Sequence, residues 1–372
     1  MLSNLFTYSK LAVCTLAIAG FTSSCNKDDD SPAPKTTNLR TAIDYSVLTP
    51  TTPYTSLFVD ANGDTTVDRN EGRDLLNILK SIDTYGKSGT TAEIDSAYIS
   101  NLFSGISNYT ATSLAQADKD KFKSQLESYF GHLASASKLY DQTASDGQAG
   151  ILTNNTSKYL VDANAIEWIQ VISKSLIGGF QYDYIGNVLL TEGLKADNSK
   201  LVAGKKYTAL EHNWDVAYGI FTKSDIYAVN ATDAVKDANE SFLGAYVWEY
   251  NKEGYKKMHA AFLKGRAAIV NNDLTVVVQQ ANIIKKEIEK AIASSSLGYL
   301  TKTKNGLTTG AGAHAFGEGL GFINSLRFCK KHNANVAFAD GVYNPLINKG
   351  FWDLVVADLV TAETAIKTQF GL

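Results

Sequence analysis

The chain has 372 residues, of which 44% are hydrophobic and 5 are proline, so it is long and apolar enough to bury a sizeable core. Its formal net charge is only −3 at pH 7, and the sequence contains no block of basic residues, which argues against a nucleic acid as a partner. Of its 3 cysteines, Cys14 and Cys25 lie close to the start; Cys329 is then left alone, which excludes a disulfide framework.

Residues 1–24 have the pattern of a bacterial signal peptide. Lys10 supplies a positive charge, and residues 11–21 form an apolar stretch that is too short to span a bilayer as a helix. The residues that follow, Thr22-Ser23-Ser24-Cys25, resemble a lipobox. This resemblance implies cleavage before Cys25 and its acylation with fatty acids such as palmitate, and several acyl chains give stable anchoring. The alternative is an ordinary cleaved signal in which the cysteine occurs by chance.

An acidic segment comes directly after the cysteine. Residues 27–30, Lys-Asp-Asp-Asp, resemble the export signal of Bacteroidota-type surface lipoproteins, which implies display on the outer face of the outer membrane. As a solvated acidic linker, the same segment would leave the protein in the periplasm. Residues 25–44 are polar and contain proline, which predicts a flexible tether and places a single, mainly helical domain at residues 45–372.

The start of that domain mixes turn formers with β-branched residues, which predicts a short irregular or hairpin segment. Residues 60–71 offer oxygen ligands at positions 1, 3, 5, 9 and 12 of a calcium-binding loop: Asp60, Asn62, Asp64, Asp68 and Glu71. The glycine that such a loop needs at position 6 is replaced by a threonine, and a glycine occupies position 4 instead. A type I′ turn at Asn62-Gly63, followed by an acidic helix start, is the alternative interpretation.

From residue 70 onward, apolar residues recur at helical spacing. The pattern predicts helices at residues 70–85, 91–103, 118–140, 162–190, 207–222, 253–294 with an interruption at 271–273, 310–330 and 344–370. Gly178-Gly179 within the fourth helix favours a kink or a tight helix crossing. Because strand signals are nearly absent, we expect an all-α fold, a multi-helix bundle.

Three segments carry a family resemblance. Residues 211–219 read HxWDxAxG from His212 onward, residues 265–273 contain RxAIxNND, and residues 314–323 contain HAxxEGLGF. These segments resemble the domain of unknown function 4856 family (DUF4856) of surface lipoproteins, and the resemblance runs from about residue 45 to the end. The family has no established catalytic residues, so the resemblance assigns none.

A second, weaker resemblance is to the imelysin-like helical proteins. Those proteins carry a GxHxxE pattern and are linked with iron uptake, which implies a related helical fold and an uptake function. Here Gly312, His314 and Glu318 read GxHxxxE, so the spacing departs from that pattern by one residue.

Two histidine–acid pairs lie at helical spacing in these segments. His314 and Glu318 are four residues apart, and His212 and Asp215 are three apart, so each pair shares a helix face. Five glycines crowd the segment around His314 and permit close approach of a backbone or a ligand. We hypothesise that both pairs face one polar pocket, with Arg266 as a neighbour, and that the pocket suits a transition metal such as iron or zinc. Alternatively, each pair satisfies buried polarity inside a crowded helix interface.

We therefore expect a lipid-anchored, cell-surface binding component of a nutrient or iron uptake system, with an outer-membrane transporter as its candidate partner. Catalysis is not the favoured function, because the HExxH signature of the commonest zinc peptidases is absent. The alternatives are a metal-dependent, peptidase-like hydrolase and a structural partner of an outer-membrane complex. The candidate cofactors are calcium and a transition metal.

Overall fold

The computed structural model describes residues 39–372, except for residues 226–231, 235 and 237–239. The predicted signal peptide, Cys25, the acidic export segment and most of the predicted tether lie outside the described residues. The folded unit comprises Asn38–Leu372. No helix of its described residues combines the length and the apolar character that a membrane crossing needs.

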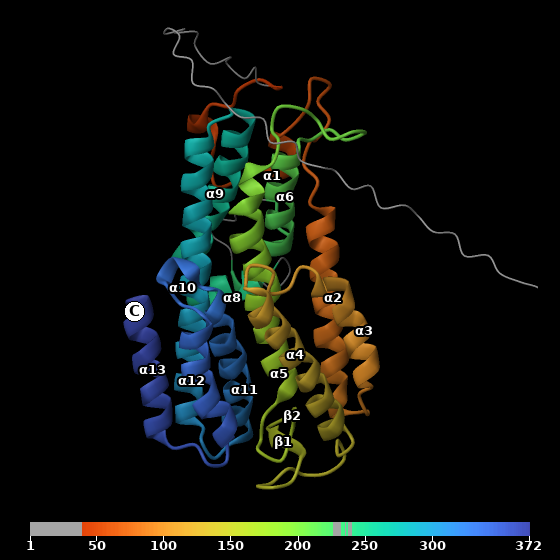
Figure 1. The fold of residues 1–372 in the computed structure, drawn as a ribbon, viewed down its shortest axis with the longest axis vertical. Helices are drawn as coiled ribbons and strands as arrows, with labels where there is room; N and C mark the ends of the chain where they lie inside the picture. The colour runs from red at the N-terminus through yellow and green to blue at the C-terminus, as the bar shows by residue number, and fades with distance from the viewer. Residues whose placement is uncertain (1–38, 226–231, 235, 237–239) are drawn as a thin grey trace, which may run out of the picture. The chain divides into compact units, whose positions relative to one another are not determined.

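Helices make up most of the folded unit, so the predicted all-α fold is confirmed (Figure 1). The described α-helices are α1 (Tyr54–Leu57), α2 (Asn70–Lys87), α3 (Ser96–Ser107), α4 (Gln116–Ser137), α5 (Trp168–Leu176), α6 (Ala209–Phe221), α8 (Leu243–Tyr250), α9 (Lys252–Val270), α10 (Leu274–Asn305), α11 (Gly310–Ser325), α12 (Val336–Lys349) and α13 (Val356–Phe370). Short 3-10 turns are η1 (Tyr45–Val47), η2 (Ser88–Thr90), η4 (Glu192–Lys195), η5 (Leu326–Phe328) and η6 (Lys330–His332), and η3 (Ile177–Leu189) is a π-helix.

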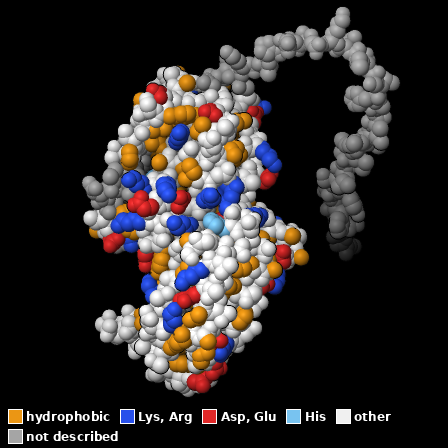
Figure 2. Space-filling view, turned by 90° about the vertical axis from the view of Figure 1, so that its left-hand side faces the viewer, with side chains coloured by type: hydrophobic (Ala, Val, Ile, Leu, Met, Phe, Trp, Pro, Cys, Tyr) orange, Lys and Arg blue, Asp and Glu red, His pale blue; other side chains and the backbone are white. Residues whose placement is uncertain are grey.

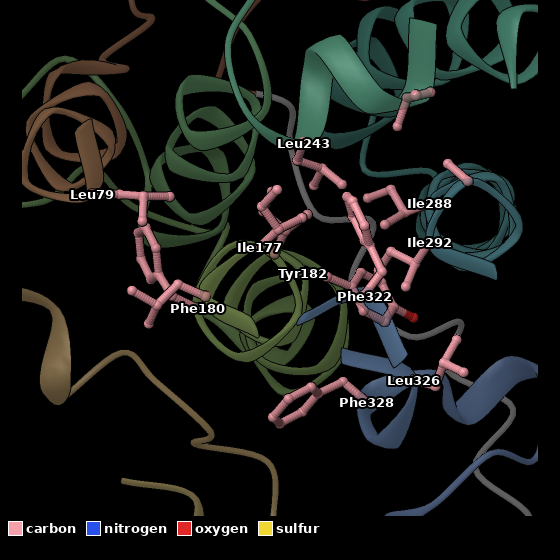
Figure 3. Close-up of a cluster of buried hydrophobic side chains, with 14 of the residues drawn as sticks. Leu79, Ile177, Phe180, Tyr182, Leu243, Ile288, Ile292, Phe322, Leu326 and Phe328 are labelled. Atoms are coloured by element: carbon pink, nitrogen blue, oxygen red, sulfur yellow. The ribbon is translucent and has the colours of Figure 1, made fainter. Parts of the chain in front are cut away.

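The long helix α10 organises the packing. It lies against α9 and α11, α11 in turn packs on α5, and α2 packs on α6 and α3. The side chains at the centre come from distant parts of the chain (Figure 3): Leu79 of α2, Phe180 of η3, Leu243 of α8, Ile288 of α10 and Phe322 of α11 all point into one buried cluster. The core is therefore continuous across the bundle.

The predicted helix at residues 162–190 is wider in its second half than an α-helix. α5 begins at Trp168 and continues without a break into the π-helix η3. A Cβ atom on Gly178 would collide with Ser325 at the end of α11, and one on Gly179 would collide with Phe122 of α4. The glycine pair thus permits the tight crossing that the sequence predicted.

The sequence did not predict α8, and the single helix expected at residues 344–370 is two helices, α12 and α13, of which α12 begins earlier, at Val336. A small β-hairpin was not predicted either. β1 (Gly150–Asn154) pairs antiparallel with β2 (Ser157–Val161), from Gly150 opposite Val161 to Asn154 opposite Ser157. In the segments GILTN and SKYLV the apolar residues stand next to one another instead of alternating with polar ones, so the segments read as a loop in the sequence.

The first described residues are held against the helices. The Arg40 guanidinium donates to the Lys206 carbonyl at 2.5 Å, and Asn271 bonds both the amide and the carbonyl of Ile43, at 2.7 and 2.8 Å. Residues 39–44, which the sequence placed at the end of the tether, are thus bound to the helical domain. The segment after them is irregular, with only η1 and α1, as predicted.

Candidate functional site

The Asp60–Glu71 segment forms a hairpin turn. Asp60 N donates to the Asp64 carbonyl at 2.8 Å, Gly63 N donates back to the Asp60 carbonyl at 3.0 Å, and Val59 bridges Thr65 in antiparallel fashion. Gly63 has φ +82°, whereas no left-handed φ occurs at Asn62. This is a three-residue loop closed by a left-handed glycine rather than the type I′ turn that we expected.

The carboxylates of this hairpin are engaged with the protein. Asp60 accepts from the amides of Asn62 and Asp64, at 2.9 and 3.0 Å, and Lys206 pairs with Asp60 and Asp64. Glu71 accepts from His212 at 3.1 Å. Across the described residues, no group of three or more His, Cys, Asp or Glu side chains is arranged to hold a metal ion. The structure therefore favours the hairpin interpretation over the calcium loop.

The first two family segments meet in a buried network, which we call the Arg266 cluster: Arg40, Tyr54, Glu211, Asp215 and Arg266. Arg266 of α9 is fully buried and donates to Glu211 at 2.8 Å and to Asp215 at 3.1 Å, both on α6. Tyr54 also donates to Asp215, at 2.7 Å, and Arg40 reaches Glu211 from the N-terminal segment. Two guanidinium groups thus face two carboxylates.

Burial and the neighbouring charges act in opposite directions on the pKa values of this network. Burial raises the pKa of Asp215, and the charge of Arg266 together with the Tyr54 hydrogen bond opposes that rise. Burial likewise acts to lower the pKa of Arg266, but Asp215 and Glu211 outweigh it and raise that pKa. Because its charges balance internally, the cluster is a structural network of the kind that fixes how buried helices and a terminal segment fit together.

Neighbouring motif residues serve the same packing. A Cβ atom on Gly265 would collide with the Trp214 ring, and the Trp214 indole donates to the Phe262 carbonyl at 2.9 Å. Asp273 caps α10 through the amide of Val276 at 3.1 Å. The glycine, tryptophan and aspartate of these segments therefore have structural tasks.

His212 lies outside the Arg266 cluster. Its ring stacks on Tyr207, with ring centroids 4.5 Å apart and an interplanar angle of 7°, and its Nε2 faces Glu71. Three residues along a helix leave about 60° between side chains, so Asp215 points into the core while His212 stays at the edge.

The third family segment builds a separate group, the His314 cluster: Glu167, Lys174, Tyr246, His314 and Glu318. His314 Nδ1 lies 2.6 Å from Glu167, and its Nε2 lies 3.5 Å from Glu318. The buried Lys174 ammonium pairs with Glu318 at 3.0 Å, and the Tyr246 hydroxyl donates to the same carboxylate at 3.0 Å. His314 also stacks on Tyr159 of β2, with centroids 4.5 Å apart.

Glycines bring these groups together. A Cβ atom on Gly321 would collide with Lys174 of α5, and one on Gly317 would press against the Glu167 carbonyl at 3.1 Å. Gly317 and Gly321 are four residues apart and so lie on one face of α11. The close approach expected for this segment is therefore a helix crossing with α5, and it carries His314 and Glu318 to their partners.

The carboxylates of the His314 cluster favour the protonated form of its histidine. Burial acts to lower the pKa of His314, but the hydrogen bond and charge of Glu167, together with Glu318, outweigh it and raise that pKa. For Glu318, burial acts to raise the pKa, and Lys174 and His314 lower it. With 28% of its side chain exposed, His314 is the solvent edge of the cluster.

This raised pKa predicts a pH-dependent stability. A histidine whose folded pKa lies above its unfolded value stabilises the protein fully below about pH 6.5 and loses that contribution as pH rises through the folded pKa. We therefore expect the difference in unfolding free energy between the wild type and His314→Gln to be larger at pH 6 than at pH 9. Urea denaturation of both proteins at the two pH values measures it. His132→Gln is the control, because His132 bonds Ser128 rather than a carboxylate. A stability difference that stays constant between the two pH values would contradict this assignment.

Two buried polar groups escaped the sequence-based prediction. His259 is buried, its Nδ1 lies 3.1 Å from the Tyr218 hydroxyl, and burial lowers its pKa to about 3. Burial raises the pKa of Glu240 to about 7, although it accepts hydrogen bonds from Thr222 and Tyr255. The burial of His259 could have been predicted from the sequence, because Tyr255 lies one helical turn before it on the same buried face.

The five residues predicted to share one pocket are divided between different places. Asp215 and Arg266 lie together in one cluster, His314 and Glu318 lie together in another, and His212 lies beside Glu71. The hypothesis of a common metal pocket is therefore not supported, and the alternative of paired buried polar groups describes both clusters. The reason is topological: α6 packs on α9 and α2, whereas α11 packs on α5 and α10.

Comparison with known proteins places the chain in a family. The family model described as "Domain of unknown function (DUF4856)" matches residues 58–372, so the chain belongs to this family, as its three segments indicated. No curated protein matches the chain, and no solved structure matches it either.

Proposed function

We propose that this member of the DUF4856 family is a lipid-anchored surface protein that binds a ligand without transforming it, as a component of a nutrient or iron uptake system. The signal sequence, Cys25 and the acidic segment after it support the anchor and its display. The candidate partner is an outer-membrane transporter, next to which a surface lipoprotein would hold its ligand.

One observation supports the non-catalytic part of this proposal: in both clusters that carry the family segments, the charged side chains are paired with one another. In the Arg266 cluster, Asp215 and Glu211 are bonded by guanidinium groups. In the His314 cluster, Nδ1 of His314 is held by Glu167 and its Nε2 faces Glu318, which Lys174 neutralises. A general base needs a free nitrogen or oxygen within hydrogen-bonding reach of a substrate proton, and these groups are directed at one another.

Anchoring is tested by removing the acylated residue. Cys25→Ala should abolish fatty-acid labelling and move the protein from the membrane pellet to the soluble fraction, because the acyl chains supply the membrane affinity. Cys25→Ser is the conservative companion variant, and Cys329→Ala, which removes a buried thiol, is the control that should remain acylated. Retention of the Cys25→Ala protein in carbonate-washed membranes would overturn the anchor.

Display at the surface is tested with the acylated protein. Replacing residues 27–30 by alanine should leave fatty-acid labelling intact while protecting the folded domain from protease added to whole cells. If protease degrades this variant as readily as the wild type, the acidic segment is not an export signal.

A further inference from the structure

On the face shown in Figure 2, basic side chains gather near the middle, around a histidine and with some acidic side chains among them. A pocket of about 440 Å³ carries three lysines on its walls: Lys285 of α10 and Lys330 and Lys331 of η6. Its other walls include Ser113 before α4 and Asn187 of η3. We call this the lysine pocket, and its volume is within the usual range for small-ligand sites.

Lys285 is the buried cation of this pocket. Only 7% of the residue is exposed, and its ammonium donates to the Leu190 carbonyl and the Thr191 hydroxyl, each at 3.1 Å. Neither acceptor carries a charge. Buried lysines are normally paired with a carboxylate, so Lys285 holds a positive charge that its bonded neighbours do not neutralise. An ammonium group has three donors, and these two bonds use two of them.

The other two lysines add to that charge. Lys330 donates to the Ser113 carbonyl at 3.0 Å, again a neutral acceptor. Lys331 is exposed. The pKa of Lys285 is lowered to about 8, chiefly because the group is buried and next because Lys331 carries the same charge. Ammonium groups on the walls of one pocket repel one another, and an anion placed between them would relieve that repulsion.

The acidic residues near the pocket are occupied elsewhere. Glu289 accepts from the amides of Lys331 and His332 and from the His332 ring, at 2.8, 2.9 and 2.7 Å. Asp183 accepts from the Ser113 amide and from Asn187, each at 3.0 Å. Glu192 lines the pocket and pairs with Lys195 at 2.5 Å. Glu289 still acts on Lys285 through its charge, and Lys330 acts on Asp183. Among the described residues, however, no carboxylate forms an ion pair with Lys285, Lys330 or Lys331, and the pocket walls carry three lysines against one carboxylate, Glu192.

We propose that the lysine pocket binds a small ligand through a phosphoryl group. Lysine ammonium groups bind phosphate as point charges, whereas carboxylate recognition favours the two-pronged fork of arginine, and the pocket walls carry lysine rather than arginine. The hydroxyl and amide donors on the walls are bonded within the protein, Thr112 to Asn108, Thr191 to Gly186 and Asn187 to Asp183 and Phe328, so the ammonium groups are the donors offered to phosphoryl oxygens. This inference rests on the proposed binding function and gives it a ligand class.

The test is calorimetric titration of the full-length lipoprotein, purified in detergent and free of phosphate, with inorganic phosphate. Phosphate should bind, binding should weaken as sodium chloride is raised, and Lys285→Met should weaken it at least tenfold. Methionine keeps the unbranched shape and most of the length of the side chain without its charge, so Lys285→Met should fold as stably as the wild type, which thermal denaturation checks. Lys302→Met on the same helix, whose partners are Glu249 and Tyr250, is the matched control and should bind normally.

Vesicles of phosphatidylcholine with or without phosphatidic acid separate a free phosphoryl ligand from a lipid headgroup. Binding to phosphatidic acid vesicles that Lys285→Met weakens, without binding of free phosphate, would place the phosphoryl group on a lipid. If citrate binds as tightly as phosphate, the preference for a phosphoryl group is overturned. If none of the three probes (phosphate, phosphatidic acid vesicles and citrate) binds, or if Lys285→Met binds them as tightly as the wild type, the site itself is overturned. These outcomes are independent of the Cys25→Ala result, so the anchor and the pocket can fail separately.

Discussion

Replacing Arg266 by leucine is expected to lower the free energy of unfolding by about 3–5 kcal/mol, because it leaves a buried carboxylate without its cation. Asp215 keeps the hydrogen bonds from Tyr54 and from the Asp68 amide but loses the guanidinium at 3.1 Å. Among the described residues, Glu211 is then left with Arg40 as its ion-pair partner. Urea denaturation of the purified protein measures this loss.

The matched control is Lys257→Leu, which removes the same charge from the same helix. Lys257 is exposed and pairs with Glu287 at 3.3 Å, and an exposed pair of this kind contributes at most about 1 kcal/mol. Arg266→Lys should fall between the two, since lysine keeps the charge but lacks the planar fork that bonds both carboxylates. If Arg266→Leu costs no more than Lys257→Leu, the cluster is not the structural network described above.

The sequence predicted what depends on local spacing. Apolar residues at helical intervals located most helices, and the interruption at residues 271–273 is where α9 ends and α10 begins. The glycines around His314 correctly predicted a close approach, because a position without a side chain leaves room for a neighbour whichever element packs there. Arg266 was also named as a neighbour of the acidic groups, and it does contact Asp215.

The partners of these residues were not predictable, because they come from remote parts of the chain. Glu167 is 147 residues from His314, and nothing in the spacing of either segment specifies that contact. Histidine and carboxylate on one helix face indicate a metal site and an internally satisfied pair equally well. Only the packing of α11 on α5, which brings Lys174 to Glu318, decides between them. The same limit explains why His212 and His314 were assigned to one pocket.

Replacing Lys174 by methionine is the second change with a large expected effect, a loss of about 3–5 kcal/mol in unfolding free energy. Lys174 pairs with Glu318 at 3.0 Å and donates to Gln170 at 2.7 Å, and both charged residues are buried. Adding Glu318→Gln should recover part of the loss, because the uncompensated carboxylate is then absent. A double-mutant cycle in urea should give a coupling of about 1–3 kcal/mol, and a coupling below about 0.5 kcal/mol would contradict the ion pair.

The pH dependence of Lys174→Met provides a sharper test of the same cluster. The charge of Lys174 acts to lower the pKa of His314, against the opposing effects of Glu167 and Glu318. Removing that charge should raise the folded pKa of His314 further, while its unfolded pKa stays unchanged. The pH at which the histidine stops contributing stability should therefore shift upward. NMR titration of the His314 ring in both proteins measures the two pKa values directly, and a lower pKa in Lys174→Met would show that Lys174 does not act on His314 through its charge.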